Sequence, residues 1–144
     1  MKSKNEKPLG PKITLYDLVK EVIKLAKKYP NNIYPNQFTC EYSSGKCSNG
    51  THGCLIGQAL KKLGFDTKRI DKMVETSDDA AGEGDINSLL DGLLRPYVRT
   101  YPSTSVSLNL KKQKYIRFLT TIQAKQDDHL TWGDALEDSI ILLQ

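Results

Sequence analysis

Apolar residues recur at intervals of three and four positions along six segments of this chain, and proline, glycine or polar runs separate the segments. In the first segment Leu15, Leu18 and Val22 repeat at this spacing, and Pro30 ends the run. Such spacing places apolar side chains on one face of an α-helix. The predicted helices span residues 14–29, 54–63, 66–74, 85–95, 109–125 and 131–143. We therefore expect an all-α fold, a single-domain bundle of five or six helices.

The 144 residues fit one domain, because two smaller units would each bury too little apolar surface. The net charge is +4, and +3 of it lies in the first twelve residues, because they contain four lysines and one glutamate. We expect residues 1–13 to form a flexible basic arm and residues 14–144 a single helical domain. On this interpretation, deleting the arm up to Pro11 leaves the melting temperature within a few degrees, because the arm has few apolar side chains to bury.

The composition narrows the class of protein. No run of about 18 apolar residues is present, so we expect no membrane-spanning helix, and no apolar segment follows the basic N-terminus as in a secretory signal. The three cysteines favour a reducing cytoplasm, where thiols stay free or bind metal. The residues after the basic arm carry a net charge of only +1, and we therefore do not expect nucleic acid as a partner.

The long polar segment 30–52 needs something to organise it, because structureless loops of this length are uncommon in compact domains. One interpretation is a small cysteine-bearing hairpin or turn, with residues 38–42 and 46–48 flanking the turn Ser43-Ser44-Gly45. The alternative is a bound metal.

Four residues of metal-ligand type lie in the segment 30–52 or just after it. Cys40, Cys47, His52 and Cys54 have the number and chemistry of a tetrahedral zinc site. The short Cys-x2-Cys pair typical of structural zinc is absent, and thiols also serve as small buried apolar groups. We therefore expect no cofactor and keep zinc as the alternative, which would make the chain a zinc-organised nucleic-acid-binding module.

Cys54 also raises the question of catalysis, because it opens a predicted helix whose N-terminus lowers the pKa of a thiol. A cysteine hydrolase needs a base, and the histidines of this chain are His52 and His129. His52 is two positions from the thiol, and His129 can approach only if the fold brings it round. An enzyme that uses Cys54 with His129 is therefore an alternative, and we expect a buried, non-catalytic cysteine.

The predicted fifth helix and the turn after it carry polar residues that the core does not require. Gln123 and Gln126 share or border the apolar face, and buried amides need hydrogen-bond partners. These partners are either the backbone of the Cys40 hairpin, which we favour, or a ligand. In the second case Arg117, Gln123, Gln126 and Trp132 line a pocket for a nucleotide-like anion, since guanidinium binds phosphate and indole stacks.

Two sequence elements carry a family resemblance. GCLIGQALKKLG at 53–64 contains a Cys-Leu-x-Gly-x-Ala-Leu helix, and TIQAKQDDHLTWGDAL at 121–136 contains Gln-x-x-Gln-Asp followed by Thr-Trp-x-x-Ala-Leu. The pair resembles that of small proteins of phages and their bacterial hosts, a family without an assigned activity, over residues 14–64 and 115–140. Cys40 and Cys54 match recurring cysteines of that family, whereas Cys47 and His52 lie outside its pattern.

These observations favour a binding function without catalysis. We expect a phage-type accessory protein that binds a host component in the cytoplasm, which is the host cytoplasm if a phage encodes it. The partner is a host protein or a small anionic, nucleotide-like molecule, and the protein could act by sequestering such a signal.

Overall fold

The computed structural model describes residues 7–35, 41–75, 86–99 and 106–144, with side chains from residue 110 onward in the last range. It confirms the all-α class. The elements are β1 (Ile13–Thr14), α1 (Leu15–Lys28), α2 (Leu55–Lys62), α3 (Thr67–Glu75), α4 (Ile86–Asp91), β2 (Val98–Arg99), α5 (Val106–Asp127), α6 (Trp132–Ile140) and a closing 3-10 helix (Ile141–Leu143). None of these helices, within the described ranges, is long and apolar enough to cross a membrane.

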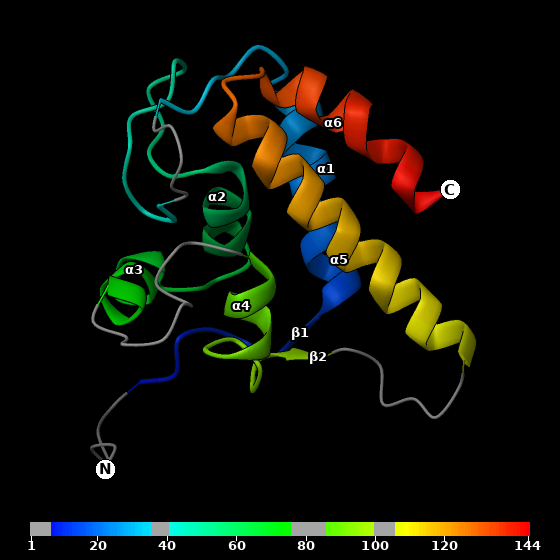
Figure 1. Cartoon of the computed structure of the whole chain (residues 1–144). Helices are drawn as coiled ribbons and strands as arrows, with labels where there is room; N and C mark the ends of the chain where they lie inside the picture. Colours follow the sequence, from blue (N-terminus) through cyan, green and yellow to red (C-terminus); the bar gives the residue numbers. More distant parts are fainter. Residues whose placement is uncertain (1–6, 36–40, 76–85, 100–105) are drawn as a thin grey trace.

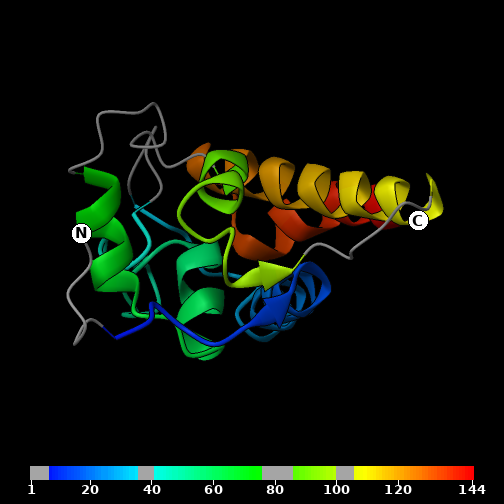
Figure 2. The ribbon, with the colours of Figure 1, turned by 90° about the horizontal axis from the view of Figure 1, so that it is seen from below.

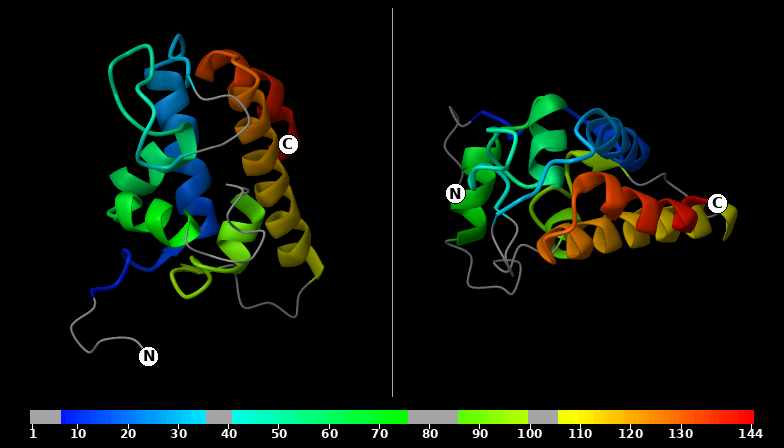
Figure 3. Two further views of the ribbon diagram at one scale, coloured as in Figure 1. Left: turned by 60° about the vertical axis from the view of Figure 1, so that its left-hand side comes forward. Right: turned by 90° about the horizontal axis from the view of Figure 1, so that it is seen from above.

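The helices pack around the long helix α5. In Figure 1, α5 crosses in front of α1, and α6 folds back along α5. Figure 2 shows α4, α5 and α6 on one side and α1 and α2 on the other. The turned views of Figure 3 show α3 at the edge beside α2, away from α6. The core lies between the two layers, where Phe118, Leu119 and Ile122 of α5 are fully buried.

Helix α1 forms as its sequence predicts. Thr14 Oγ1 accepts a hydrogen bond from the Asp17 backbone N–H, and the Asp17 carboxylate accepts one from the Thr14 N–H, each at 3.0 Å. This reciprocal capping satisfies two backbone donors that a helix start otherwise leaves free. The hydrogen bond from the Thr14 backbone also lowers the pKa of Asp17.

Part of the arm expected over residues 1–13 packs on the core: Leu9 and Ile13 are buried, whereas Lys7, Pro8, Pro11 and Lys12 are exposed, and residues 1–6 lie outside the described ranges. Leu9 is only 4% exposed, and its backbone N–H donates to the Tyr97 hydroxyl at 3.1 Å. Full burial of a leucine stabilises by about 1.5–3 kcal/mol, which offsets part of the entropy lost when the segment becomes ordered.

Two further contacts fasten this segment to the fold. A Cβ atom on Gly10 would lie 2.4 Å from the Phe65 ring, so only glycine allows the close approach. Ile13 pairs with Val98 in the parallel β1–β2 pair, and its N–H donates to the Tyr97 carbonyl at 2.8 Å. The segment thereby holds β2 in place.

The cysteine-bearing segment folds differently from the predicted hairpin. The observed bridge joins Lys46 to His52, and the Cys47 N–H donates to the Thr51 carbonyl at 2.7 Å. The turn therefore lies at residues 48–50 rather than at Ser43–Gly45. Residues 36–40, which include much of the first predicted strand, lie outside the described ranges.

Gly57 of α2 lies directly against the loop that contains Tyr42. A Cβ atom on Gly57 would lie 2.1 Å from the Tyr42 carbonyl oxygen and 2.5 Å from the Tyr42 Cα. Tyr42 is itself 1% exposed. Glycine at this position thus allows the loop backbone to lie directly on the helix.

Candidate functional site

The two glutamines predicted to lie at the edge of the core bind helix N-termini. Gln126 Oε1 accepts a hydrogen bond from Leu55 N, the first residue of α2, at 2.5 Å, and Gln123 Oε1 accepts one from Ile86 N, the first residue of α4, at 3.1 Å. Gln126 is 1% exposed and Gln123 6%. Each amide oxygen thus accepts a hydrogen bond from an N–H at the start of α2 or α4, which has no acceptor within that helix. The partners of the amides are backbone groups, as expected, but they belong to the starts of α2 and α4 and not to the Cys40 hairpin.

The amide of Gln126 also donates to Asp127 Oδ1 at 3.0 Å. The pKa of Asp127 is raised to about 6, mainly by burial and to a smaller extent by the neighbouring Asp128 carboxylate, although the Gln126 hydrogen bond lowers it. Asp127 is the last residue of α5, where the negative end of the helix dipole also disfavours a carboxylate. The ionised carboxylate therefore destabilises the folded state.

We expect Asp127→Asn to stabilise the protein at pH 8 but not at pH 4. Because the folded pKa is raised above the value of 3.8 in the unfolded chain, the penalty is present above pH 6 and disappears as the pH falls towards 4. For a half-buried group screened by solvent, we expect a gain of about 1 kcal/mol in urea unfolding at pH 8. The control Glu137→Gln removes an exposed carboxylate, and an equal gain there would contradict this interpretation.

The four residues of the predicted ligand pocket do not converge. Arg117 is exposed, and it is nine positions, or two and a half helical turns, from Gln126, which places it on the opposite face of α5. Trp132 is fully buried, and its indole N–H has no hydrogen-bond acceptor among the described residues, whereas we expected it to be bonded. Thr131 caps α6 as predicted, by accepting from the Asp134 N–H.

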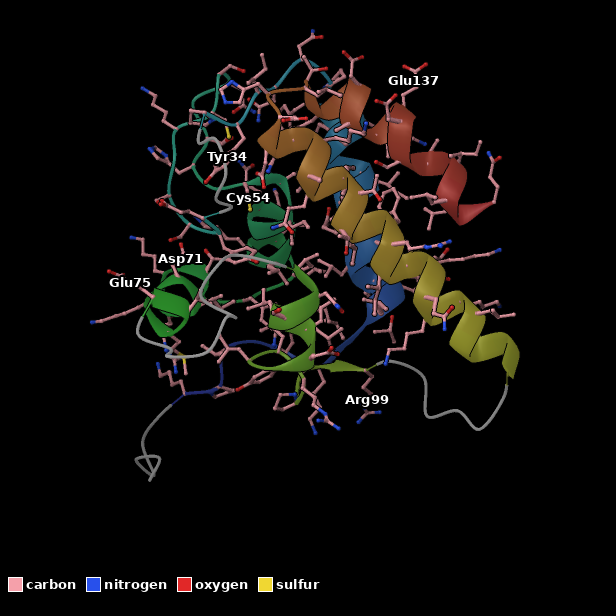
Figure 4. All side chains as sticks on the ribbon, in the orientation of Figure 1. Tyr34, Cys54, Asp71, Glu75, Arg99 and Glu137 are labelled. Carbon is pink, nitrogen blue, oxygen red and sulfur yellow. The ribbon has the colours of Figure 1, made fainter. Side chains whose placement is uncertain are left out.

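The two cysteines in the described ranges are in different chemical states. Cys54 is disulfide-bonded and fully buried, while Cys47 is a free, buried thiol. Figure 4 shows Cys54 at the start of α2. Cys47 Sγ donates to the Gly53 carbonyl at 3.3 Å, and burial raises the pKa of this thiol. Cys40 lies outside the described ranges. A disulfide at Cys54 differs from the reduced thiols that the cysteine count predicted.

The states of Cys47 and Cys54 bear on the zinc and enzyme alternatives. Within the described ranges, no three His, Cys, Asp or Glu side chains form a group that could hold a metal ion. The zinc alternative stays a prediction, because Cys40 is part of it. A disulfide sulfur is not the thiolate that nucleophilic catalysis requires. His129 is exposed and adopts a left-handed backbone conformation, with a φ of 67°, in the turn after α5.

A different site appears where α1, α4, β2 and α5 meet. A hollow of about 590 Å³ opens there, within the size range of small-molecule sites. Its polar lining consists of Arg95, Arg99, Lys112 and Asp91, and its apolar lining consists of Leu15, Leu90, Val98 and Ile116. We call this hollow the cationic pocket. Figure 4 shows Arg99 at the end of β2, at the lower edge of the molecule.

The charges of the cationic pocket are not neutralised by other side chains. In the described part of the chain, Arg95, Arg99 and Lys112 take part in no ion pair; the pairs present are Lys20–Asp17 and Lys125–Asp138. With Asp91 the lining has a formal charge of +2. Cations that converge on a hollow from three elements without neutralising partners are typical of an anion-binding site.

A second hollow, of about 550 Å³, is lined by Thr51, His52, Gln58, Lys61 and Lys62. Its lining is entirely polar, and both of its lysines lie in the last turn of α2, where they complement the helix dipole. Their position thus has a structural explanation, which the cations of the cationic pocket lack.

Arg95, Arg99 and Lys112 are not among the site residues that the sequence predicted. The available signal was a run without acids around Pro96, in which the two arginines are four positions apart. Because Pro96 ends regular structure there, spacing alone could not show that both side chains reach the same hollow as Lys112.

Comparison with protein-family models, with curated proteins and with solved structures gives no match for this chain. The resemblance to small phage and bacterial proteins therefore stays a prediction.

Proposed function

We propose that this protein binds a small anionic molecule in the cationic pocket without converting it chemically. The observation that supports the proposal is the convergence of Arg95, Arg99 and Lys112 on one hollow without ion-pair partners. The guanidinium groups can each donate two parallel hydrogen bonds to a carboxylate or phosphate, and the ammonium group adds a mobile point charge.

The absence of catalysis follows from the lining of the cationic pocket. Its described side chains include no hydroxyl, thiol or imidazole group, so the pocket lacks the usual pairing of a nucleophile with a base. Asp91 is its single carboxylate, whereas general acid–base hydrolysis commonly uses two. Binding, and through it sequestration, is the activity that these residues support.

The biological setting that we propose is that of a phage-type accessory protein, which removes a host molecule from the host cytoplasm. This part of the proposal rests on the family resemblance of residues 14–64 and 115–140. A host protein with an acidic surface is the other partner that such a pocket could accept.

Thermal unfolding with a panel of small anions tests the proposal. A ligand at a hundred times its dissociation constant adds about 2.7 kcal/mol to the stability. We expect phosphate-bearing molecules to raise the melting temperature by several degrees, and Arg99→Gln or Lys112→Gln to reduce this shift strongly. Lys111→Gln, at the neighbouring position of α5 but not in the lining, is the matched control. If no anion raises the melting temperature, the proposal fails and a protein partner takes its place.

A further inference from the structure

We infer that the ligand of the cationic pocket is a nucleoside monophosphate, with its phosphate at the three cations and its base on the apolar floor. This inference rests on the proposed function and deepens it. It depends on how the charged and apolar parts of the lining are combined in one hollow.

The floor of the pocket is apolar and belongs to the core. Leu15 is 1% exposed, Val98 6% and Leu90 8%, and the half-buried Ile116 of α5 completes this surface. An inorganic anion would use the cations alone and leave Ile116, the most exposed residue of the floor, in contact with water. A ligand with a flat apolar part gains about 25 cal/mol for each Å² of apolar surface that it covers. The floor therefore favours an organic anion over a simple ion.

The charge of the lining fits one phosphate monoester. Three cations and Asp91 give +2, and a phosphate monoester carries about −1.5 to −2 near pH 7. A ligand with several phosphates would exceed this charge and would bring negative charge towards Asp91. A single phosphate group can be neutralised by the cations while the rest of the ligand stays uncharged.

Asp91 favours a ligand that carries hydrogen-bond donors as well as a phosphate. A carboxylate only accepts hydrogen bonds, so it needs a ligand that also carries hydroxyl or N–H donors. Asp91 lies at the end of α4, next to the floor residue Leu90 and four positions before Arg95. Ribose hydroxyls and the exocyclic amines of bases are such donors. A fatty or alkyl phosphate has the charge and the apolar part but lacks these donors.

Isothermal titration calorimetry with the full chain and four probes tests the inference. Adenosine monophosphate has all three features, adenosine lacks the phosphate, ribose 5-phosphate lacks the base, and hexyl phosphate lacks the donors. We expect adenosine monophosphate to bind at least tenfold more tightly than each of the other three. We also expect Arg99→Gln to weaken its binding at least tenfold while leaving the weak binding of adenosine unchanged.

Two further variants separate the floor from the cations. Ile116→Ser is expected to weaken adenosine monophosphate binding severalfold and to leave ribose 5-phosphate unchanged. Arg117→Gln, at the next position of α5 and on the exposed side, is expected to change neither. Circular dichroism melting curves check that each variant is folded.

The outcomes distinguish the inference from the proposed function. If the three phosphates bind equally and all lose affinity in Arg99→Gln, the pocket binds anions but the nucleoside inference is wrong. Equal binding of hexyl phosphate and adenosine monophosphate, with ribose 5-phosphate weaker, also overturns it, since the donors then contribute nothing. If none of the phosphates binds, the inference is wrong, and the thermal unfolding panel of small anions then decides the proposed function.

Discussion

Deleting residues 1–11 is expected to lower the free energy of unfolding by more than about 3 kcal/mol. The deletion removes Leu9, which is 4% exposed, and exposes the core surface that it covers. Truncating a buried leucine alone costs about 2–5 kcal/mol. The deletion also removes the Leu9 carbonyl, which accepts a hydrogen bond from the Asp66 N–H at 2.8 Å ahead of α3. Urea unfolding followed by circular dichroism measures the loss.

Two control variants test whether the loss of stability comes from the contacts of residues 7–11. Deleting residues 1–6 keeps all of the contacts described above, and we expect it to leave the stability within about 0.5 kcal/mol. The full-length variant Leu9→Ala should lose about 2–5 kcal/mol without any change of chain length. If the longer deletion were as stable as the shorter one, residues 7–11 would not be part of the folded domain, and the position of β2 would need another explanation.

Gly57→Ala is expected to destabilise the protein by about 3 kcal/mol or more. In an ordinary helix interior the same substitution stabilises, because alanine exceeds glycine in helix propensity by about 1 kcal/mol. Here the new Cβ atom would lie 2.1 Å from the Tyr42 carbonyl oxygen, so backbone must move away from α2. Overpacking of this kind typically costs about 1–3 kcal/mol, and more where backbone cannot yield.

The sign of the effect is the diagnostic observation for Gly57. Lys61→Ala, on the exposed side of the same helix, serves as the control and should change the stability by less than about 0.5 kcal/mol. A gain in stability from Gly57→Ala would mean that the loop at Tyr42 does not lie on α2. Should Gly57→Ala fail to fold under conditions in which Lys61→Ala folds, the prediction is met in its strongest form.

The elements that the sequence predicted well are those whose signals are local. Helix α1 has an apolar face, the Thr14–Asp17 capping pair and a terminating Pro30 within seventeen residues, so no distant contact is needed to define it. Helix α4 shows the limit of such signals. Its apolar pattern continues to Leu94, but the helix ends at Asp91, just before Gly92. Glycine is a poor helix former, and the last leucines are buried from a turn instead.

The parts that could not be predicted depend on contacts between distant residues. Leu9 sits among lysines, prolines and a glycine, and nothing near it in the sequence shows that the Tyr97 hydroxyl accepts its N–H or that Phe65 lies against Gly10. Likewise the glutamines of α5 could be assigned to the edge of the core, but not to the particular helix starts that they cap. The cationic pocket combines residues from four elements, and its cations resemble an ordinary solvated surface until those elements are placed together.

The central claim is the location of ligand binding, and nuclear magnetic resonance of the ¹⁵N-labelled full chain tests it most directly. Titration with adenosine monophosphate should shift the backbone amides of residues 90–99 and 112–116 most strongly, with a saturating concentration dependence. The Arg99→Gln variant should need a much higher ligand concentration for the same shifts. The claim is contradicted if the largest shifts fall on residues 51–62, or around Gln123 and Gln126, or if shifts grow without saturation over all exposed lysines.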